Sequence, residues 1–292
     1  MRLKDPFNRP VTNLRVSLTP ACNLNCLYCH AEGEVSPGSL LSAEEIAAVM
    51  RMAAEYEFRS VKFTGGEPLL RPDVLEIIRS VPAGMESSLT TNGTLLARLA
   101  ADLKEAGLSR VNVSLDSLDP ATYRKITRKD CLSEVIEGIE AALDAGLTPV
   151  KLNMVVLSGI NEDEVPAFLD FVKGNRDLVL QLIELMDIRD CPYHSELSGL
   201  EQELARHSTH ILTRRMHHRH KYCCNGSEVE VVRPLHNTEF CAFCNRLRLT
   251  SDGMLKPCLL RADNHVDIRG AEGDGLRSLF IEAVRRRAPY YH

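Results

Sequence analysis

The sequence predicts an α/β protein in which helices cover a parallel sheet. Up to about residue 187, segments with strand character alternate with amphipathic segments of helical period. Counting the first strand, there are six such units, and this alternation is typical of a parallel sheet with its helices outside. Six units are fewer than the eight of a closed barrel. At 292 residues and 44% hydrophobic, the chain is long enough for one large domain and a smaller extension.

The expected elements follow one another with recognisable boundary signals. Ser42 and Glu45 form a capping box, after which apolar residues repeat at helical spacing as far as Phe58, and Asn161 with Glu164 predicts a second capping box. Gly107 and Gly146 stand where helices end. The expected strands are 14–18, 60–64, 86–91, 109–115, 148–156 and 178–185, and the other expected helices are 73–80, 94–106, 132–145 and 162–173.

After residue 187 the alternation stops, which predicts two domains, 1–187 and 188–292. The second contains a polar segment at 189–215, a helical stretch near 196–206 and two hairpins. One hairpin is expected to turn at Asn225-Gly226 and the other at Asp252-Gly253.

Composition narrows the class of protein. A formal charge of −5 gives no reason to expect a nucleic-acid partner, and the basic run 214–221, which could bind phosphates, is interpreted as a solvated face. The N-terminus lacks an apolar signal core and no run reaches the ~18 apolar residues of a membrane span, so a cytoplasmic location without a membrane partner is expected. Ten cysteines then indicate metal ligation rather than disulfides.

Three of these cysteines stand in a loop directly after the first strand. Cys22, Cys26 and Cys29 have C-x3-C-x2-C spacing, and Pro20 ends the strand. Three thiols can hold one metal centre, but they neither close a tetrahedral zinc site nor coordinate every iron of a cubane cluster. One position therefore stays open. The same residues also fit a zinc knuckle completed by His30, or reduced core thiols.

A second set of three thiols lies in the extension. Cys241 and Cys244 are followed by Cys258 on the far arm of the second hairpin, and Cys223, Cys224 or His236 could complete a zinc ribbon. Between the cysteines, the period of two puts Arg246, Arg248 and Thr250 on one face of a strand, opposite Leu247 and Leu249. Two guanidiniums on one face form a fork for phosphate or carboxylate, although an exposed strand face has the same pattern.

The predicted barrel strands also carry polar residues on one face. Arg15 and Ser17, Lys62 and Thr64, Asn112 and Ser114, and Lys151 and Asn153 occupy alternate positions. Parallel strands covered on both faces are normally apolar throughout, so this pattern predicts a cavity. Buried like charges need an anion, and a multiply charged anionic ligand is expected. Pairing with acidic groups such as Glu184 is the alternative.

The first cysteine motif, with Thr64-Gly-Gly-Glu-Pro68 one unit later, resembles the radical S-adenosylmethionine (SAM) enzymes. Glycine is needed where the main chain approaches a ligand closely. The resemblance implies a partial (β/α)6 TIM-like barrel of the radical SAM type with a small C-terminal cluster-binding extension. It also implies a [4Fe-4S] cluster held by Cys22, Cys26 and Cys29, with SAM chelated at the open iron. The SAM contacts that it implies are Tyr28, Gly66, Ser114 and Met186.

The pattern C-x2-C-x-R-x-R-x-T-x2-G-x4-C, preceded by Val232-Arg-Pro, resembles the GTP 3′,8-cyclase family of molybdenum or tungsten cofactor biosynthesis. This implies a second [4Fe-4S] cluster at Cys241, Cys244 and Cys258, whose open iron binds guanine. It also implies a ferredoxin- or flavodoxin-type electron donor and a cyclic pyranopterin synthase downstream. The implied GTP contacts are Arg15, Lys62, Thr91, Lys151, Arg246, Leu247 and Arg248.

The resemblance also has a departure. Many relatives end in a Gly-Gly tail that reaches the active site, whereas this chain ends Ala288-Pro-Tyr-Tyr-His292 after three arginines, 285–287. Three alternatives are expected: the arginine run replaces that tail, a different mode of closure operates, or the run is only a cationic helix end that complements the helix dipole. A peptide-modifying radical SAM enzyme with an auxiliary cluster and a non-catalytic zinc-binding scaffold are the alternative functions.

Overall fold

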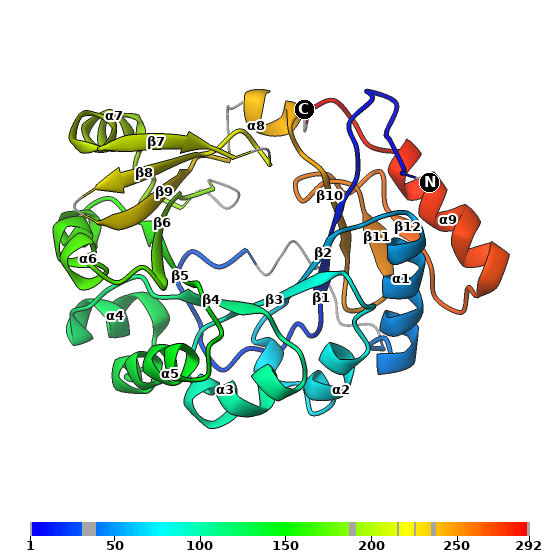
Figure 1. Ribbon diagram of the computed structural model, residues 1–292, viewed down its shortest axis with the longest axis horizontal. Helices are drawn as coiled ribbons and strands as arrows, with labels where there is room; N and C mark the ends of the chain where they lie inside the picture. Colours follow the sequence, from blue (N-terminus) through cyan, green and yellow to red (C-terminus); the bar gives the residue numbers. More distant parts are fainter. Residues whose placement is uncertain are drawn as a thin grey trace.

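The structure is a computed structural model that describes residues 2–30, 39–186, 191–214, 216–224, 226–234 and 238–290. Its centre is a curved sheet in which six parallel strands follow one another in chain order, with helices along the outer side (Figure 1). The predicted partial (β/α)6 barrel is confirmed. The strands are β1 (Asn13–Ser17), β2 (Ser60–Thr64), β3 (Glu86–Thr91), β4 (Arg110–Ser114), β5 (Val150–Val156) and β6 (Leu178–Glu184).

The outer helices largely begin and end where the sequence predicts. The Ser42–Glu45 capping box is confirmed, with Ser42 Oγ accepting the Glu45 N–H at 3.2 Å and Glu45 Oε2 accepting the Ser42 N–H at 2.7 Å. Gly107 and Gly146 follow two helices at φ +97° and +70°. The helices are α1 (Ala43–Glu55), α2 (Val74–Arg79), α3 (Leu96–Glu105), α4 (Pro120–Thr127), α5 (Leu132–Asp144) and α6 (Val165–Phe171), with short 3₁₀ turns at Pro68–Leu70 and Glu162–Glu164.

Two details of this half differ from the sequence prediction. The capping box at Asn161 and Glu164 is wrong, because the Asn161 side chain accepts the N–H of Leu157 and donates to the carbonyls of Asp116 and Val155. Helix α4 was not predicted. Its Asp119-Pro120 start is a regular helix signal, since Asp119 caps the N–H of Thr122 and proline suits the first turn.

The C-terminal residues extend the barrel sheet at both edges. At one edge β10 (Arg246–Leu249) pairs parallel with β1, followed outward by β11 (Met254–Lys256) and β12 (Val266–Asp267). At the other edge β9 (Ser227–Val232) pairs parallel with β6, followed by β8 (His220–Cys224) and β7 (His210–Thr213). The remaining helices are α7 (Ser198–His207), α8 (Thr238–Ala242) and α9 (Gly273–Arg285).

The hairpin at Asp252-Gly253 is confirmed by the antiparallel pairing of β10 with β11. Of the other predicted turn, Asn225 lies outside the described residues, while β8 and β9 run antiparallel on either side of it. The boundary between 187 and 188 also lies outside them, and the division into two domains stays a prediction.

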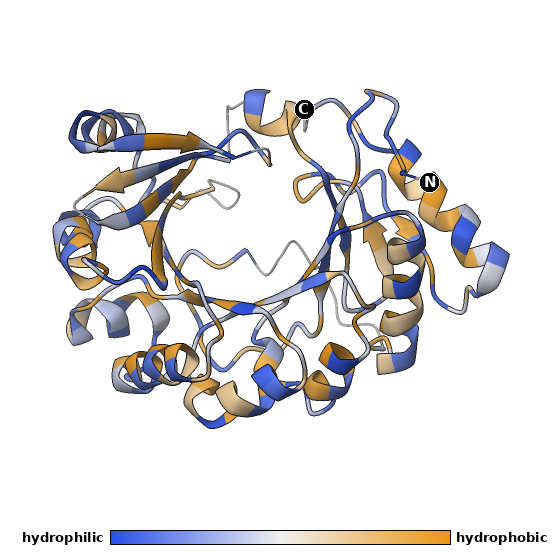
Figure 2. Cartoon of the chain, viewed as in Figure 1, coloured by the Kyte–Doolittle hydropathy of each residue, from blue (hydrophilic) through white to orange (hydrophobic). Residues whose placement is uncertain are grey.

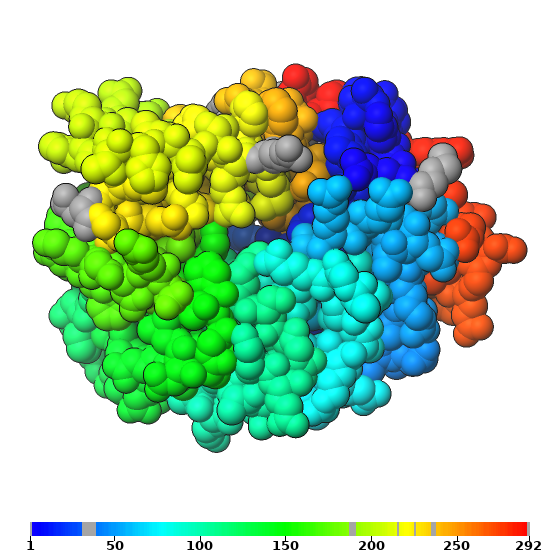
Figure 3. Space-filling model, viewed as in Figure 1, coloured from blue at the N-terminus to red at the C-terminus, as the bar shows by residue number. Residues whose placement is uncertain are grey.

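The two faces of the sheet differ as the alternation predicts. Leu14, Val16, Val61, Phe63 and Leu89 are fully buried against the helices, whose hydrophobic sides face the sheet in Figure 2. The polar residues lie on the inner face. In the space-filling view this side of the molecule opens at its centre, and N-terminal residues of the barrel are visible inside (Figure 3). No helix among the described residues is long and apolar enough to cross a membrane.

Candidate active site

The first cysteine loop is fastened to the Gly65-Gly66-Glu67 turn that follows β2. The N–H of Gly66 donates to the carbonyl of Thr19 at 2.7 Å, and that of Glu67 donates to the carbonyl of Ala21, also at 2.7 Å. A Cβ atom on Gly66 would lie 2.2 Å from the Ala21 carbonyl oxygen. Because only glycine permits this approach, the turn sets the position of the cysteine loop.

The Glu67 side chain stabilises this turn through three hydrogen bonds. Its carboxylate accepts the N–H of Leu69 at 3.0 Å, the hydroxyl of Thr91 at 2.8 Å and the N–H of Asn92 at 2.7 Å. Burial raises the pKa of Glu67 to about 7, although these three donors favour the ionised form. The hydroxyl of Thr91 is therefore already engaged with Glu67.

Tyr28 stands between Cys26 and Cys29 in the chain, and it contacts Asp116, two residues after the end of β4. Its hydroxyl donates to Asp116 at 2.6 Å, and Asp116 also accepts the N–H of Val155 at 2.9 Å. Burial raises the pKa of Asp116 to about 6. The unpredicted helix α4 supports the same loop, since the N–H groups of Asn25 and Leu27 donate to the carbonyls of Thr127 and Ile126.

The three thiols of this loop interact with one another. Burial raises the pKa of Cys26, and the negative charges of Asp116, Cys29 and Cys22 act in the same direction. Burial likewise raises the pKa of Cys22, to which Glu67 and Cys29 contribute. A bound metal cation would deprotonate thiols of this kind and compensate the mutual repulsion of the thiolates. The Cys22–Cys26–Cys29 set is thus a suitable donor set for one.

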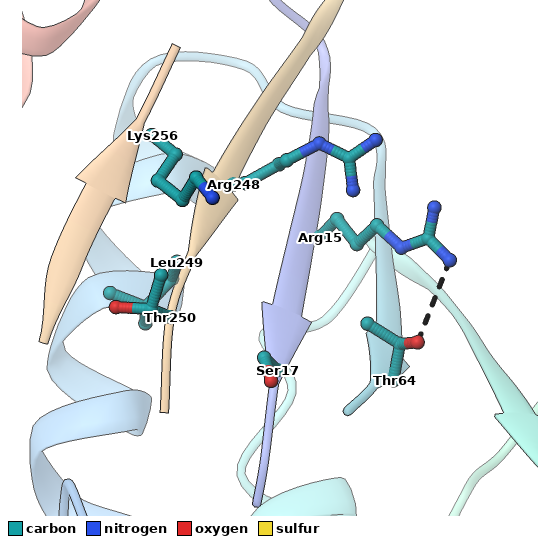
Figure 4. A pocket seen from close by; sticks show the side chains of 7 residues that line it. All are labelled: Arg15, Ser17, Thr64, Arg248, Leu249, Thr250 and Lys256. Atoms are coloured by element: carbon teal, nitrogen blue, oxygen red, sulfur yellow. Dashed lines mark hydrogen bonds between the residues drawn. The ribbon is translucent and has the colours of Figure 1, made fainter. Parts of the chain in front are cut away.

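A row of cations crosses the inner face of the sheet between β11 and β2. The strand register places Lys256 opposite Arg248, Arg248 opposite Arg15 and Arg15 opposite Lys62. Figure 4 shows the side chains of Arg15 and Arg248 extending in the same direction from adjacent strands, with an Arg15 Nη2 to Thr64 Oγ1 distance of 3.5 Å. The pocket that they line is completed by Ser17, Leu249, Thr250 and Lys256.

Lys62 lies among several other cations. Burial lowers the pKa of Lys62 well below its ordinary value, and the cations Arg15, Arg110, Arg246 and Lys151 lower it further. Arg246 behaves in the same way, since burial, Arg248 and Arg15 lower its pKa. A multiply charged anion between these side chains would remove the electrostatic cost.

Lys151 has an acidic partner, although not the predicted one. Its Nζ lies 2.7 Å from Oε1 of Glu230 on β9, while Glu184 is 3.3 Å from Arg233 instead. Glu230 also binds Arg214 at 2.6 Å and Gln181 at 2.6 Å, and Arg219 lies 3.6 Å away. Glu230 was missed because it lies on a strand whose pairing with β6 is long-range.

The interpretation of the basic run 214–221 as a solvated face is wrong for most of its described residues. Arg214 and Arg219 bind Glu230, and Lys221 binds Glu228. His217 is buried and stacks on Phe240 with ring centres 3.7 Å apart, and His218 stacks on Phe243 at 3.8 Å. Arg215 lies outside the described residues. The run therefore neutralises the buried Glu230 and packs against the aromatic residues in and next to α8.

The second set of thiols lies beside the cation row. Burial raises the pKa of Cys241, and the neighbouring thiols of Cys244 and Cys258 act in the same direction. Burial would also raise the pKa of Cys244, but Arg287, Arg246 and Arg248 outweigh it and lower that pKa. A cationic surrounding of this kind stabilises thiolates as metal ligands.

The two sets of thiols lie at opposite ends of the same strands. Cys22 follows the carboxyl end of β1, whereas Cys244 precedes β10, which pairs parallel with β1 from Asn13 and Arg246 onward. The five residues of β1 span about 17 Å at about 3.3 Å per residue. The inner face between the two ends carries Arg15, Lys62 and Arg248. A ligand bound along this face would therefore lie between the two sets of thiols.

The other predicted ligands and contacts have specific places. Cys224 is buried with its sulfur 3.3 Å from Ser208 Oγ, and Cys223 is buried on the same strand. His236 lies outside the described residues. Leu247 is fully buried in the core, which leaves its main chain for any ligand contact. Ser114 ends β4 and the half-buried Met186 follows β6, both at the edge that carries the first cysteine loop.

No three His, Cys, Asp or Glu side chains of the described residues converge on a single-ion site. A cubane cluster makes a different demand, because each thiolate binds its own iron and the ligands stand farther apart than around one zinc ion. None of the ten cysteines forms a disulfide.

Comparison with known families and proteins agrees with this geometry. Residues 16–172 match the Radical SAM superfamily and residues 178–292 match Molybdenum Cofactor Synthesis C. A protein of Methanocella arvoryzae named "Probable GTP 3′,8-cyclase" is 50% identical over 99% of this chain and 94% of its own length. One of Archaeoglobus fulgidus with the same name is 48% identical over 99% of both chains. The chain belongs to the GTP 3′,8-cyclase family.

Solved structures support the fold of this family member. SuiB of Streptococcus suis, bound to its precursor peptide SuiA, superposes with a TM-score of 0.67 at 16% identity, over 88% of this chain and 60% of SuiB. A structure titled "Native anSMEcpe with bound AdoMet" gives 0.64 at 19% identity, over 91% of this chain and 80% of that one. These likenesses establish the radical SAM fold.

The cofactors of a GTP 3′,8-cyclase are two [4Fe-4S] clusters and S-adenosylmethionine. The chain fits them, because it offers two separate sets of three free thiols. Cys22 and Cys29 of the first set are exposed and Cys26 is half-buried, whereas all three thiols of the second set are half-buried and arginines lower the pKa of Cys244. The zinc-binding scaffold is excluded by family membership.

Proposed function

We propose that this chain converts GTP to (8S)-3′,8-cyclo-7,8-dihydroguanosine 5′-triphosphate. The observation that carries the proposal is the cation row Lys256–Arg248–Arg15–Lys62, which lies between two sets of cysteines at opposite ends of the sheet. Arg15, Lys62, Lys151, Arg246 and Arg248 would bind the triphosphate and guanine ends of one nucleotide. Of the other two proposed GTP contacts, Thr91 would act through its Glu67-bound hydroxyl, and Leu247 would act through its main chain.

Cys22, Cys26 and Cys29 would hold the SAM cluster, and Cys241, Cys244 and Cys258 the auxiliary cluster that faces guanine. When bound, the SAM cluster and SAM would supply the radical chemistry that removes hydrogen from C3′ of GTP; after C3′ joins C8, one further electron and a proton would complete the product. The chain supplies orientation: Tyr28, Gly66, Ser114 and Met186 line the edge where SAM would lie. The arginine and lysine side chains fix the triphosphate so that C3′ is held near that edge.

Two further partners belong to this proposal. An electron donor of the ferredoxin or flavodoxin type would reduce the clusters, and a cyclic pyranopterin synthase would consume the product. Arg233 and Arg214 are engaged with the carboxylates of Glu184 and Glu230. The cations proposed to bind the triphosphate stand mainly on β1, β2 and β10.

Anaerobic purification followed by iron and sulfide analysis and incubation with GTP, SAM and a strong reductant tests the proposal. About eight irons per chain and GTP-dependent formation of the 3′,8-cyclised product with 5′-deoxyadenosine are expected. SAM cleavage that requires a peptide and leaves GTP unchanged would refute it and favour a peptide-modifying enzyme.

A further inference from the structure

Both ends of the described chain meet at the loop that carries Cys241 and Cys244. Arg9 donates from Nη1 to the carbonyl of Cys241 at 2.8 Å, and Arg287 donates from Nη2 to the carbonyl of Cys244 at 2.6 Å. In Figure 1 the N-terminal segment and the C-terminal end approach each other next to α8. The main-chain carbonyls of Cys241 and Cys244 are therefore each bound by an arginine from a different end of the chain.

One carboxylate organises both arginines. Asp5 Oδ2 lies 2.6 Å from Arg9 Nε and 3.1 Å from Arg287 Nη1, and the Asp5 side chain is completely buried. Its other oxygen accepts the N–H groups of Phe7 and Arg9. The side chains of Arg9 and Arg287 are 11% and 2% exposed. Two guanidiniums and one carboxylate leave one net positive charge beside the thiols.

The same network closes the two termini onto each other. Arg9 Nη2 donates to the carbonyl of Ala288 at 2.6 Å, and Nη1 donates to that of Pro289 at 3.0 Å. Burying three charged groups costs more free energy than burying hydrophobic residues of similar size. A planar guanidinium fork, however, fixes two carbonyl groups in one geometry, which a hydrophobic contact cannot do.

We propose that Asp5, Arg9 and Arg287 are positioning residues for the auxiliary cluster. They hold the main chain at Cys241 and Cys244 so that both thiols face one centre, and their net positive charge favours the reduced cluster. This inference rests on the proposed function, since it requires a cluster at Cys241, Cys244 and Cys258. Of the arginine run 285–287, Arg287 thus acts on the cluster and does not serve only to complement the helix dipole.

Arg287→Gln in the full-length, anaerobically purified protein tests the inference, with Arg286→Gln as the matched control. Arg286 is the next residue toward α9, is 44% exposed, and contacts Glu282 and the carbonyl of His265. Both variants remove one positive charge from the same helix end. Only Arg287 touches the cysteine loop.

The readouts are iron per chain and the midpoint potential of the auxiliary cluster, followed by electron paramagnetic resonance. Arg287→Gln is expected to lower iron from about eight toward about four per chain, or to make the midpoint potential more negative. The signals of the SAM cluster should not change in either variant. Equal iron content and equal potential in Arg287→Gln and Arg286→Gln would overturn the inference.

Arg287→Lys separates geometry from charge and serves if Arg287→Gln does not fold. Lysine keeps the positive charge but loses the fork, so lower occupancy of the auxiliary cluster at an unchanged potential is expected. Wild-type occupancy and potential in Arg287→Lys, together with an unfolded Gln variant, would contradict the inference. If the wild-type protein itself binds only about four irons, the auxiliary cluster is missing and the proposed function is contradicted as well. If the wild type binds about eight irons and the Arg287 variants behave like the wild type, only the present inference is contradicted.

Discussion

Lys151 and Glu230 face each other across the inner side of the sheet, with 2.7 Å between Nζ and Oε1 and both side chains at least nine-tenths buried. Burial lowers the pKa of Lys151 to about 8, while Glu230 opposes that shift. The carboxylate of Glu230 also binds Arg214, so this one acid forms ion pairs with more than one cation on the inner side of the sheet.

Glu230→Gln should destabilise the ligand-free protein by about 3 to 5 kcal/mol, because it leaves buried cations without their counter-charge. GTP should then raise the unfolding temperature of this variant more than that of the wild type, since the triphosphate replaces the lost negative charge. Thermal unfolding with and without GTP measures both effects. Glu228→Gln is the control, since Glu228 pairs with Lys221 and is 37% exposed. Equal responses of the two variants would contradict the role of Glu230.

Gly66→Ala should displace the first cysteine loop, because the added Cβ would lie 2.2 Å from the carbonyl oxygen of Ala21. We expect loss of SAM binding and lower retention of the first cluster. Equilibrium SAM binding and iron content measure these effects. Gly199→Ala is the matched control, because no atom lies within 4 Å of its Cβ position. Wild-type SAM affinity in Gly66→Ala would show that the close approach is unimportant.

Arg248→Ala should weaken GTP binding about 10- to 100-fold, the range for one charge-assisted contact of about 1.5 to 3 kcal/mol. Both clusters should be retained, because Arg248 lies in the cation row and not in a cysteine loop. Titration calorimetry with GTP and iron analysis provide the two measurements. Loss of iron with unchanged GTP affinity would show that Arg248 is architectural.

The ionisation of Asp116 should make stability fall as pH rises through about 6. Burial raises its pKa from 3.8 to about 6, so its contribution to stability is fully present below about 3.8 and is lost above 6. Asp116→Asn should remove this loss, which amounts to about 3 kcal/mol for about two pKa units. Denaturant unfolding of the cluster-free, reduced chain between pH 4 and 7 measures the difference.

Asp119→Asn provides the comparison, since the Thr122 N–H lowers the pKa of Asp119 and the slope from that group has the opposite sign. Parallel stability profiles of the wild type and Asp116→Asn would exclude the effect.

The sequence was sufficient for those features that depend on local pattern. Strand alternation placed Arg15, Lys62 and Arg248 on one inner face, and capping residues located the start of α1. Asp119-Pro120 is a local helix-start signal from which α4 could also have been predicted. From the sequence, the need for glycine at position 66 could be related only to a ligand. The structure shows a second reason, because the main chain of the cysteine loop at Ala21 leaves no room for a Cβ atom there.

Long-range pairing could not be read from local pattern. Nothing in the period of residues 246–249 indicates that β10 joins β1, or that β9 brings Glu230 to Lys151. The same holds for the contact of Arg287 with Cys244, which joins an otherwise unremarkable arginine run to a metal-binding motif. Such contacts depend on tertiary packing, which outweighs local preference.

The central claim is that GTP lies in the cation-lined space with C3′ toward the first cysteine loop. Turnover of GTP carrying deuterium at C3′, followed by mass analysis of 5′-deoxyadenosine, tests this claim directly. The account predicts transfer of one deuterium to 5′-deoxyadenosine in the wild type. Product formation with unlabelled 5′-deoxyadenosine would contradict it.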